Sequence, residues 1–143
     1  MKPLLLALAC CTPLAALAQM TPVGRWNSVD DMTGEPKAQM QIVERDGQLT
    51  GRIVQVLRKD ADPQARCTAC TDERKDRPLV GLELIRGAQK ATGKEVWEGG
   101  NILDPESGRV YTLRLTPIEG GRKLEVRGSF GPFSRTQTWL RQP

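Results

Sequence analysis

The sequence contains no histidine, and its 143 residues include only three tryptophans, two phenylalanines and one tyrosine. Histidine is the side chain that most often serves as a general base near neutral pH, and it is also a common zinc ligand. Ser129, in the stretch GSFG, does not have the spacing of a nucleophile elbow. We therefore expect a protein that is not an enzyme and that carries no cofactor or metal.

An excess of one charge is also missing. Lysine and arginine total 21 and aspartate and glutamate total 17, for a net charge of +4, and the two signs are interleaved along the chain. No basic stripe of the kind that binds nucleic acid is visible. Beyond the N-terminus no apolar run is long enough to span a bilayer. We expect neither a nucleic-acid partner nor stable membrane insertion, and the sequence identifies no protein partner.

The one long apolar run lies at the N-terminus. The run, residues 4–17, follows Lys2 and is interrupted by Thr12 and Pro13, and the sequence ALA stands at positions 16–18. These are the features of a secretory signal peptide with its cleavage site. The sequence therefore predicts that residues 1–18 are removed, that residues 19–143 form one domain, and that the protein is periplasmic or secreted.

The four cysteines divide between this leader and a single CxxC pair. A lipoprotein would be acylated at Cys10 or Cys11, but neither follows a Leu-Ala-Gly type box. Cys67 and Cys70 lie in the polar segment 66–78, and such a pair tends to form a disulfide in an oxidising compartment. We favour a disulfide that fixes a local loop. A thiol redox site is the more specific alternative. A zinc site is a further one, and it would need ligands besides these two cysteines.

The remainder of the sequence has the pattern of short antiparallel strands separated by turns. Apolar residues alternate or cluster at 38–43, 49–57, 96–97, 110–115, 124–126 and 136–141. A phase shift near Gly51 indicates a bulge, and residues 79–89 fit either a short helix or another strand. Asp30 and Asp31, before Thr33-Gly34, indicate a turn more than a calcium site or a catalytic acid. This pattern predicts an all-β protein, either a closed up-and-down barrel of about eight strands or a sandwich.

A series of short motifs runs through the chain in a fixed order. They are Gly24-Arg25-Trp26, Asp30-Asp31, Thr33-Gly34, Cys67-x-x-Cys70, Lys75-Asp76-x-Pro78, Gly81-Leu82, Trp97-x-Gly99-Gly100-x-Ile102-Leu103-Asp104-Pro105, Gly108, Tyr111, Val126-Arg127-Gly128 and Arg135-Thr136-Gln137-x-Trp139. This ordered set resembles the bacterial secreted family catalogued as the domain of unknown function 2147. The resemblance implies a lipocalin-like β-barrel in an exported protein. It implies no activity, because the family has no established one.

The sequence Gly24-x-Trp26 is similar to the N-terminal signature of lipocalins. The likeness implies that Trp26 closes one end of the barrel beneath an arginine of the last strand, with Arg141 favoured over Arg135. A ligand would then enter at the opposite end. The contact between ring and cation is worth on the order of 1 kcal/mol or more when it is desolvated.

A barrel of this size often holds one small ligand, so we expect a small apolar or amphipathic molecule in its interior. The candidate ligand-binding residues are Trp97, Tyr111 and Arg127. Arg127 alternates outward from its apolar neighbours and would face the interior only if a bulge at Gly128 reversed it. The glycines after Trp97 would let another strand or a ligand approach the backbone. The alternative functions are a protein–protein interaction module of the cell envelope and, less favoured, a thiol redox protein.

Overall fold

The computed structural model describes residues 20–143, so the expected signal peptide lies outside the described residues. The described chain consists of eight strands and one short 3-10 turn, η1 (Glu119–Gly121). The strands are β1 (Gly24–Val29), β2 (Pro36–Arg45), β3 (Gln48–Val56), β4 (Glu83–Lys90), β5 (Trp97–Leu103), β6 (Val110–Ile118), β7 (Lys123–Phe130) and β8 (Phe133–Gln142). Segment 79–89 therefore contributes a strand rather than a helix. The described residues include no helix long and apolar enough to cross a membrane.

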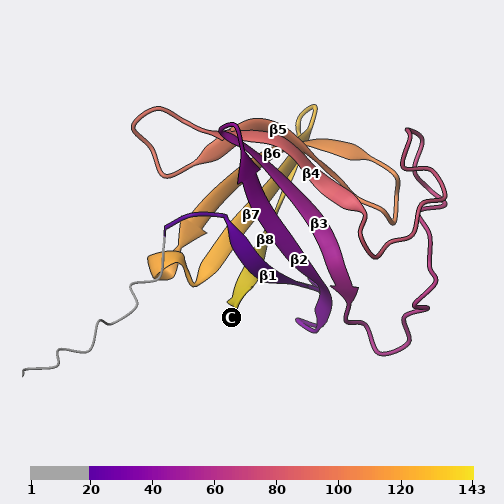
Figure 1. Ribbon diagram of the computed structural model, residues 1–143. Coiled ribbons are helices and arrows are strands. Elements are labelled where there is room, and N and C mark those ends of the chain that lie inside the picture. The colour runs from indigo at the N-terminus through magenta and orange to yellow at the C-terminus, as the bar shows by residue number, and fades with distance from the viewer. Residues whose placement is uncertain (1–19) are drawn as a thin grey trace, which may run out of the picture.

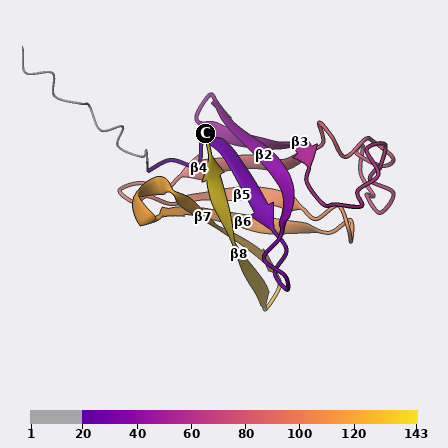
Figure 2. The same cartoon turned by 90° about the horizontal axis from the view of Figure 1, so that it is seen from below.

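Each strand pairs antiparallel with the next, and β8 returns to β1 to close the barrel (Figures 1 and 2). The closing contact is short, with three residue pairs: Arg25 with Gln142, Trp26 with Arg141, and Asn27 with Leu140. The rest of β8 pairs with β7 alone. In Figure 1 the tip of the β7–β8 hairpin and the β1–β2 connection lie at opposite sides of the view. The barrel is thus drawn together at one end and wide at the other.

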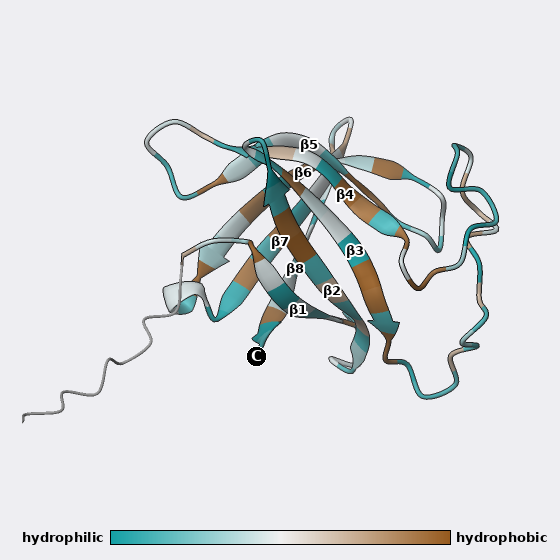
Figure 3. Ribbon diagram, in the orientation of Figure 1, coloured by the Kyte–Doolittle hydropathy of each residue, from teal (hydrophilic) through white to brown (hydrophobic). Residues whose placement is uncertain are grey.

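The interior is lined by every second residue of the strands, as the alternation in the sequence predicts. Figure 3 shows this alternation as brown and teal bands along β2 and β3. The core contains all three tryptophans, and its other members are mostly aliphatic. The buried apolar residues are Trp26, Met40, Ile42, Leu49, Ile53, Cys67, Cys70, Leu82, Leu84, Ile85, Ala88, Trp97, Leu103, Leu113, Leu115, Leu124, Val126 and Trp139.

Two glycines in the strands have a steric purpose. The β3–β4 register shifts on either side of the Thr50–Gly51 step, and a Cβ at Gly51 would lie 3.0 Å from the Cβ of Ile85. A Cβ at Gly100 would lie 2.3 Å from the carbonyl oxygen of Arg86. The backbone that approaches Gly100 is therefore that of the neighbouring strand β4, which is one of the two possibilities that the sequence left open.

The long β3–β4 connection carries the disulfide between Cys67 and Cys70. The two cysteines are 0% and 1% exposed and belong to the core, so the disulfide is part of the packed interior. The turn between β5 and β6 lies directly against this loop, because a Cβ at Gly108 would lie 1.9 Å from the carbonyl oxygen of Ala69. The connection therefore forms one wall of the wide end of the barrel.

An ion pair with a buried arginine holds the β3–β4 connection in place. The Arg74 side chain is 5% exposed, and its Nη2 lies 2.6 Å from Oδ2 of Asp72, while Nη1 donates to the Glu83 carbonyl oxygen at 2.8 Å. The hydrogen bonds from Arg74 hold the pKa of Asp72 down, at about 2. Arg74 thus ties the loop to the start of β4 through a charge-assisted contact.

Candidate ligand-binding site

The narrow end of the barrel is closed by Trp26 and Arg141. Trp26 is fully buried, and its Nε1 donates to the carbonyl oxygen of Pro22 at 2.8 Å. The guanidinium carbon of Arg141 lies 4.2 Å from the centre of the Trp26 ring. The structure therefore brings together the two residues for which the sequence predicts this contact.

Arg141 also gathers three backbone carbonyls at this end. Its guanidinium donates to the carbonyl oxygens of Gly121 at 2.5 Å, Val23 at 2.9 Å and Thr21 at 2.6 Å. Burial lowers the pKa of Arg141, but an arginine remains charged at neutral pH. The side chain thereby joins β8, η1 and the chain before β1 into a plug that closes this end.

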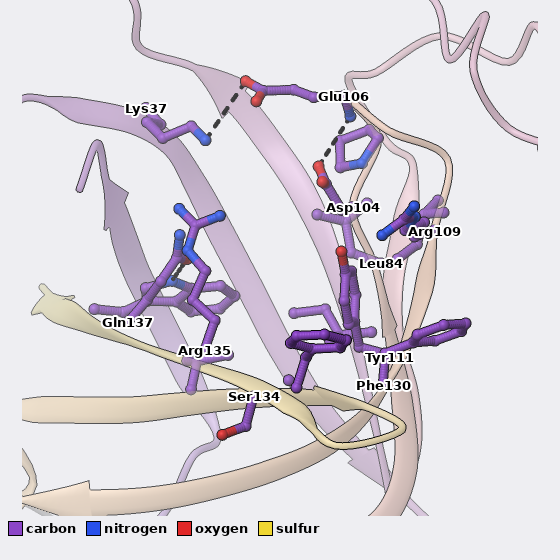
Figure 4. Close-up of a pocket in the computed structure, with 17 residues that line it drawn as sticks. Lys37, Leu84, Asp104, Glu106, Arg109, Tyr111, Phe130, Ser134, Arg135 and Gln137 are labelled. Atoms are coloured by element: carbon purple, nitrogen blue, oxygen red, sulfur yellow. Dashed lines mark hydrogen bonds and ion pairs between the residues drawn. The ribbon is translucent and has the colours of Figure 1, made fainter. Parts of the chain in front are cut away.

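The wide end contains a cavity of about 300 Å³ (Figure 4). Its walls come from β5 to β8, from the β5–β6 turn, from the start of β2 and from Leu84 of β4. The lining residues are Lys37, Leu84, Ile102, Leu103, Asp104, Pro105, Glu106, Arg109, Tyr111, Val126, Gly128, Phe130, Phe133, Ser134, Arg135, Gln137 and Trp139. Apolar side chains form most of the wall, and the charged ones lie toward the mouth.

A second hollow of about 270 Å³ adjoins the first. Six residues line both: Lys37, Leu84, Asp104, Pro105, Glu106 and Trp139. The second hollow extends toward β2, β3 and the β3–β4 connection, where Met40, Ile53 and Leu79 contribute apolar surface. Leu84 and Trp139 therefore stand between two halves of one interior space at the wide end.

Aromatic side chains shape the first hollow. The rings of Tyr111 and Phe130 meet edge to face, with their centres 6.3 Å apart. Two residues before Phe130, β7 carries Gly128, where a Cβ would lie 3.1 Å from the Cβ of Tyr111 on β6. Because Gly128 has no side chain, Tyr111 can pack closely against the backbone of β7.

Ion pairs ring the mouth. Glu106 lies 3.5 Å from the Lys37 ammonium and 2.8 Å from the Arg58 guanidinium, and Arg58 also lies 3.6 Å from Asp30. Asp30 caps the β1–β2 turn, because its Oδ1 accepts from the backbone N–H groups of Met32 and Thr33. These backbone hydrogen bonds, first that from Thr33, lower the pKa of Asp30. Asp30 therefore has the turn-capping role that the sequence favours.

Across the gap between β1 and β8, Asp31 binds the last strand. Its Oδ2 pairs with the Arg135 guanidinium and accepts from Gln137 Nε2 at 3.5 Å. Gln137 in turn accepts a hydrogen bond from Nε1 of Trp139 at 3.3 Å. A polar chain therefore runs along the inner face of β8, from the buried Trp139 to the mouth.

The three predicted ligand residues fall in different places. Tyr111 lines the cavity, as described above. Trp97 is 6% exposed, packs in the core with the Lys90 ammonium 5.8 Å from its ring centre, and does not line this cavity. Arg127 is exposed on the outer face and donates to Ser134 Oγ at 3.2 Å. The β6–β7 pairing is unbroken at Gly128, so no bulge turns Arg127 inward.

The sequence analysis missed Lys37, Arg109 and Arg135 as cavity residues. Arg135 could have been found from the alternation along β8, because Trp139, Gln137 and Arg135 are two residues apart and share a face. Arg109 follows the β5–β6 turn, and no pattern in the sequence shows that this turn folds over the cavity. Lys37 lies at the irregular start of β2, beside the register shift between Ser28 and Val29 in β1.

Cys67 and Cys70 form a disulfide in the β3–β4 connection, whose residues Ala65 and Leu79 line the second hollow. Thiol exchange requires that an attacking thiolate reach one of the sulfur atoms. Both cysteines are buried in the core, so this geometry offers such a thiolate no access. The disulfide is therefore a structural link within the packed core.

The chain belongs to the family described as "Uncharacterized protein conserved in bacteria (DUF2147)", whose model matches residues 24–141. No curated protein is significantly similar to it. Among solved structures it is similar to protein HP1028 from the human pathogen Helicobacter pylori, which is described as belonging to the lipocalin family. The two share 17% sequence identity at a TM-score of 0.70, over 85% of this chain and 82% of the other. This likeness shows that the fold is lipocalin-like.

Proposed function

We propose that the protein binds a small amphipathic molecule in the wide half of its barrel and that it does so without catalysing a reaction. One observation carries the proposal: one end is plugged by Trp26 and Arg141, and the other opens into a mostly apolar cavity with charged groups at its mouth. Pockets of this construction, with apolar walls and a few placed polar groups, are typical of small-molecule sites.

The size of the space agrees with this function. The two adjoining hollows measure about 300 and about 270 Å³, which together suit a single small ligand rather than a large one. The lipocalin-like fold supports a ligand-binding role by analogy. A filled interior would have favoured the alternative of a protein-interaction module, and the open cavity favours a ligand instead.

We also infer that the protein acts in the periplasm or outside the cell. The support is the signal-peptide pattern of residues 1–18 together with the disulfide between Cys67 and Cys70, which forms readily in oxidising compartments. N-terminal sequencing of protein taken from the cells that make it should begin at Gln19. An acylated cysteine at position 10 or 11 would replace this proposal with a lipoprotein.

The binding proposal is tested with N-phenylnaphthylamine, a neutral dye that fluoresces in apolar sites. Titration should show saturable binding to the wild-type protein. Leu84→Phe, at the junction of the two hollows, should fill the space and weaken binding by about tenfold or more. Leu140→Phe is the matched control, because Leu140 is exposed on the outer face of β8 and should leave binding unchanged. A wild-type protein that does not bind the dye, or two variants that behave alike, would contradict the proposal.

A further inference from the structure

We propose that the ligand carries an anionic group, and that Arg109 and the hydroxyl of Tyr111 hold this group at the mouth of the cavity. The inference rests on the proposed function and adds the chemical class of the ligand. Around the mouth, the carboxylates have partners within the protein, whereas two hydrogen-bond donors have no acceptor among the described residues.

The carboxylates on the β5–β6 side already have partners. Glu106 pairs with Lys37 and Arg58. The Asp104 carboxylate is hydrogen-bonded within the β5–β6 turn. Its Oδ1 accepts from the backbone N–H of Glu106 at 3.0 Å, and its Oδ2 accepts from the Ser107 hydroxyl at 2.7 Å. The Glu106 charge is therefore met by two cations, and both carboxylate oxygens of Asp104 already accept hydrogen bonds.

The acceptors on the β8 side also have partners. Asp31 is held by Arg135 and Gln137, and the side-chain oxygen of Gln137 accepts from Trp139. The Ser134 hydroxyl accepts from Arg127. The carboxylate and amide acceptors and the Ser134 hydroxyl named above are thus engaged by the protein.

Two donors at the mouth differ from this pattern. Among residues 20–143, no carboxylate lies within ion-pair distance of Arg109, whose guanidinium carbon is 5.8 Å from the centre of the Phe130 ring. The hydroxyl of Tyr111 likewise makes no hydrogen bond within that part of the chain. Figure 4 shows Arg109 and Tyr111 in the wall of the cavity, with Asp104 nearby. Both groups line the cavity.

A guanidinium and a phenol hydroxyl can donate together to one anion with several oxygens. Arginine presents a planar fork of N–H groups that matches a carboxylate, a sulfonate or a phosphate, and charge-assisted bonds of this kind are about twice as strong as neutral ones. The apolar part of the ligand would lie against Phe130, Val126 and Ile102, deeper in the same cavity. A neutral alcohol would lack the charge and the second oxygen that this fork of donors matches.

The test compares two dyes that share one skeleton. N-phenylnaphthylamine is neutral, and anilinonaphthalene sulfonate adds a sulfonate to the same rings. Arg109→Gln and Tyr111→Phe should each raise the Kd for the sulfonate by about tenfold, the lower end for a lost charge-assisted hydrogen bond, and change the Kd for the neutral dye by less than about twofold. Arg127→Gln is the matched control, since the same exchange on the outer face of β7 should change neither Kd.

The outcomes separate the two proposals. If the wild-type protein does not bind the neutral dye, the proposed function fails. If it binds both dyes but Arg109→Gln and Tyr111→Phe weaken them equally, or weaken neither, the anionic group is wrongly assigned and the proposed function stands. If Arg127→Gln alone weakens the sulfonate, the anion binds the outer face and the inference is overturned.

A second measurement needs no variant. Decanoate, decyl phosphate and decanol share one chain, and each is used to displace N-phenylnaphthylamine from the wild-type protein. Raising the salt from about 0.05 to about 0.5 M should weaken displacement by the two anions and leave decanol unaffected, because salt screens exposed charges. A preference between decanoate and decyl phosphate identifies the anion. Equal salt dependence for decanol and both anions would overturn the inference.

Discussion

Arg141 and Trp26 are direct partners in the pairing of the last strand with the first, and the guanidinium of one lies over the indole of the other. The side chains therefore reinforce the closing strand pair, which is only three residue pairs long. Burial of the ring, the contact between ring and cation and the three carbonyls bound by Arg141 all act at one place. Because these interactions are concentrated at one place, we expect substitutions at the narrow end to lower stability.

Trp26→Ala should lower the free energy of unfolding by about 3–5 kcal/mol, as for other buried aromatic residues. Arg141→Ala should cost less, and the double variant should cost less than the sum because the two side chains share a contact. Denaturant unfolding measures all three values. Arg25→Ala, at an exposed neighbouring position, is the control and should change stability little. Strict additivity of the two losses would show that the contact contributes nothing.

Removing the disulfide should weaken the protein without unfolding it. Cys67→Ala together with Cys70→Ala opens a loop of four residues, for which the loss is about 2 kcal/mol. Alanine avoids placing unpaired hydroxyls in the buried site. Because Arg74 still ties the loop to β4, we expect one cooperative unfolding transition at lower denaturant. A variant without any cooperative transition would show that the disulfide is needed for the whole fold.

Gly108→Ala should displace the disulfide loop from the β5–β6 turn. The new methyl would overlap the Ala69 carbonyl, and the backbone φ of +75° is unfavourable for alanine. Gly93→Ala shares the second cost without the first, because Gly93 has a φ of +70° and nothing within 4 Å of its Cβ position. Gly108→Ala should therefore lose about 1–3 kcal/mol more than Gly93→Ala in denaturant unfolding. Equal losses would mean that the loop moves away at no cost.

Asp72 should make the stability depend on pH in the acid range. Its pKa is about 2 in the folded protein, below the ordinary value of 3.8. A lowered pKa stabilises the folded state above pH 4, and this stabilisation is lost as the pH falls toward 2. It amounts to about 2 kcal/mol at most, and to less because the Asp72 side chain is 34% exposed. The stability difference between wild type and Asp72→Asn should therefore shrink between pH 5 and pH 2, and a difference that stays constant would refute this assignment.

The strand pattern and the plug could be predicted from the sequence because both depend on local order. Alternating residues specify which side of each strand is buried, and eight antiparallel strands in sequence order place the start of the first beside the end of the last. Trp26 and Arg141 occupy those two positions. Their contact follows from the topology.

The binding site could not be predicted in the same way, because it depends on how the strands diverge and how the turns fold. Arg127 and Arg135 are both arginines on late strands, and an unbroken register puts the first outside and the second inside. Arg109 reaches the cavity through a turn whose path depends on the close approach of Gly108 to Ala69. Contacts of this kind join segments far apart in the chain, so no local pattern records them.

The short seam between β1 and β8 has a consequence for the order of folding. Every other strand pair joins neighbours in sequence, whereas this one joins the two ends of the domain. Bringing distant segments together costs more chain entropy than forming a hairpin. Here only three residue pairs and the buried contact of Trp26 with Arg141 offset that cost. The β-meander from β1 to β8 is therefore expected to form first and the ring to close last, when Trp26 and Arg141 meet.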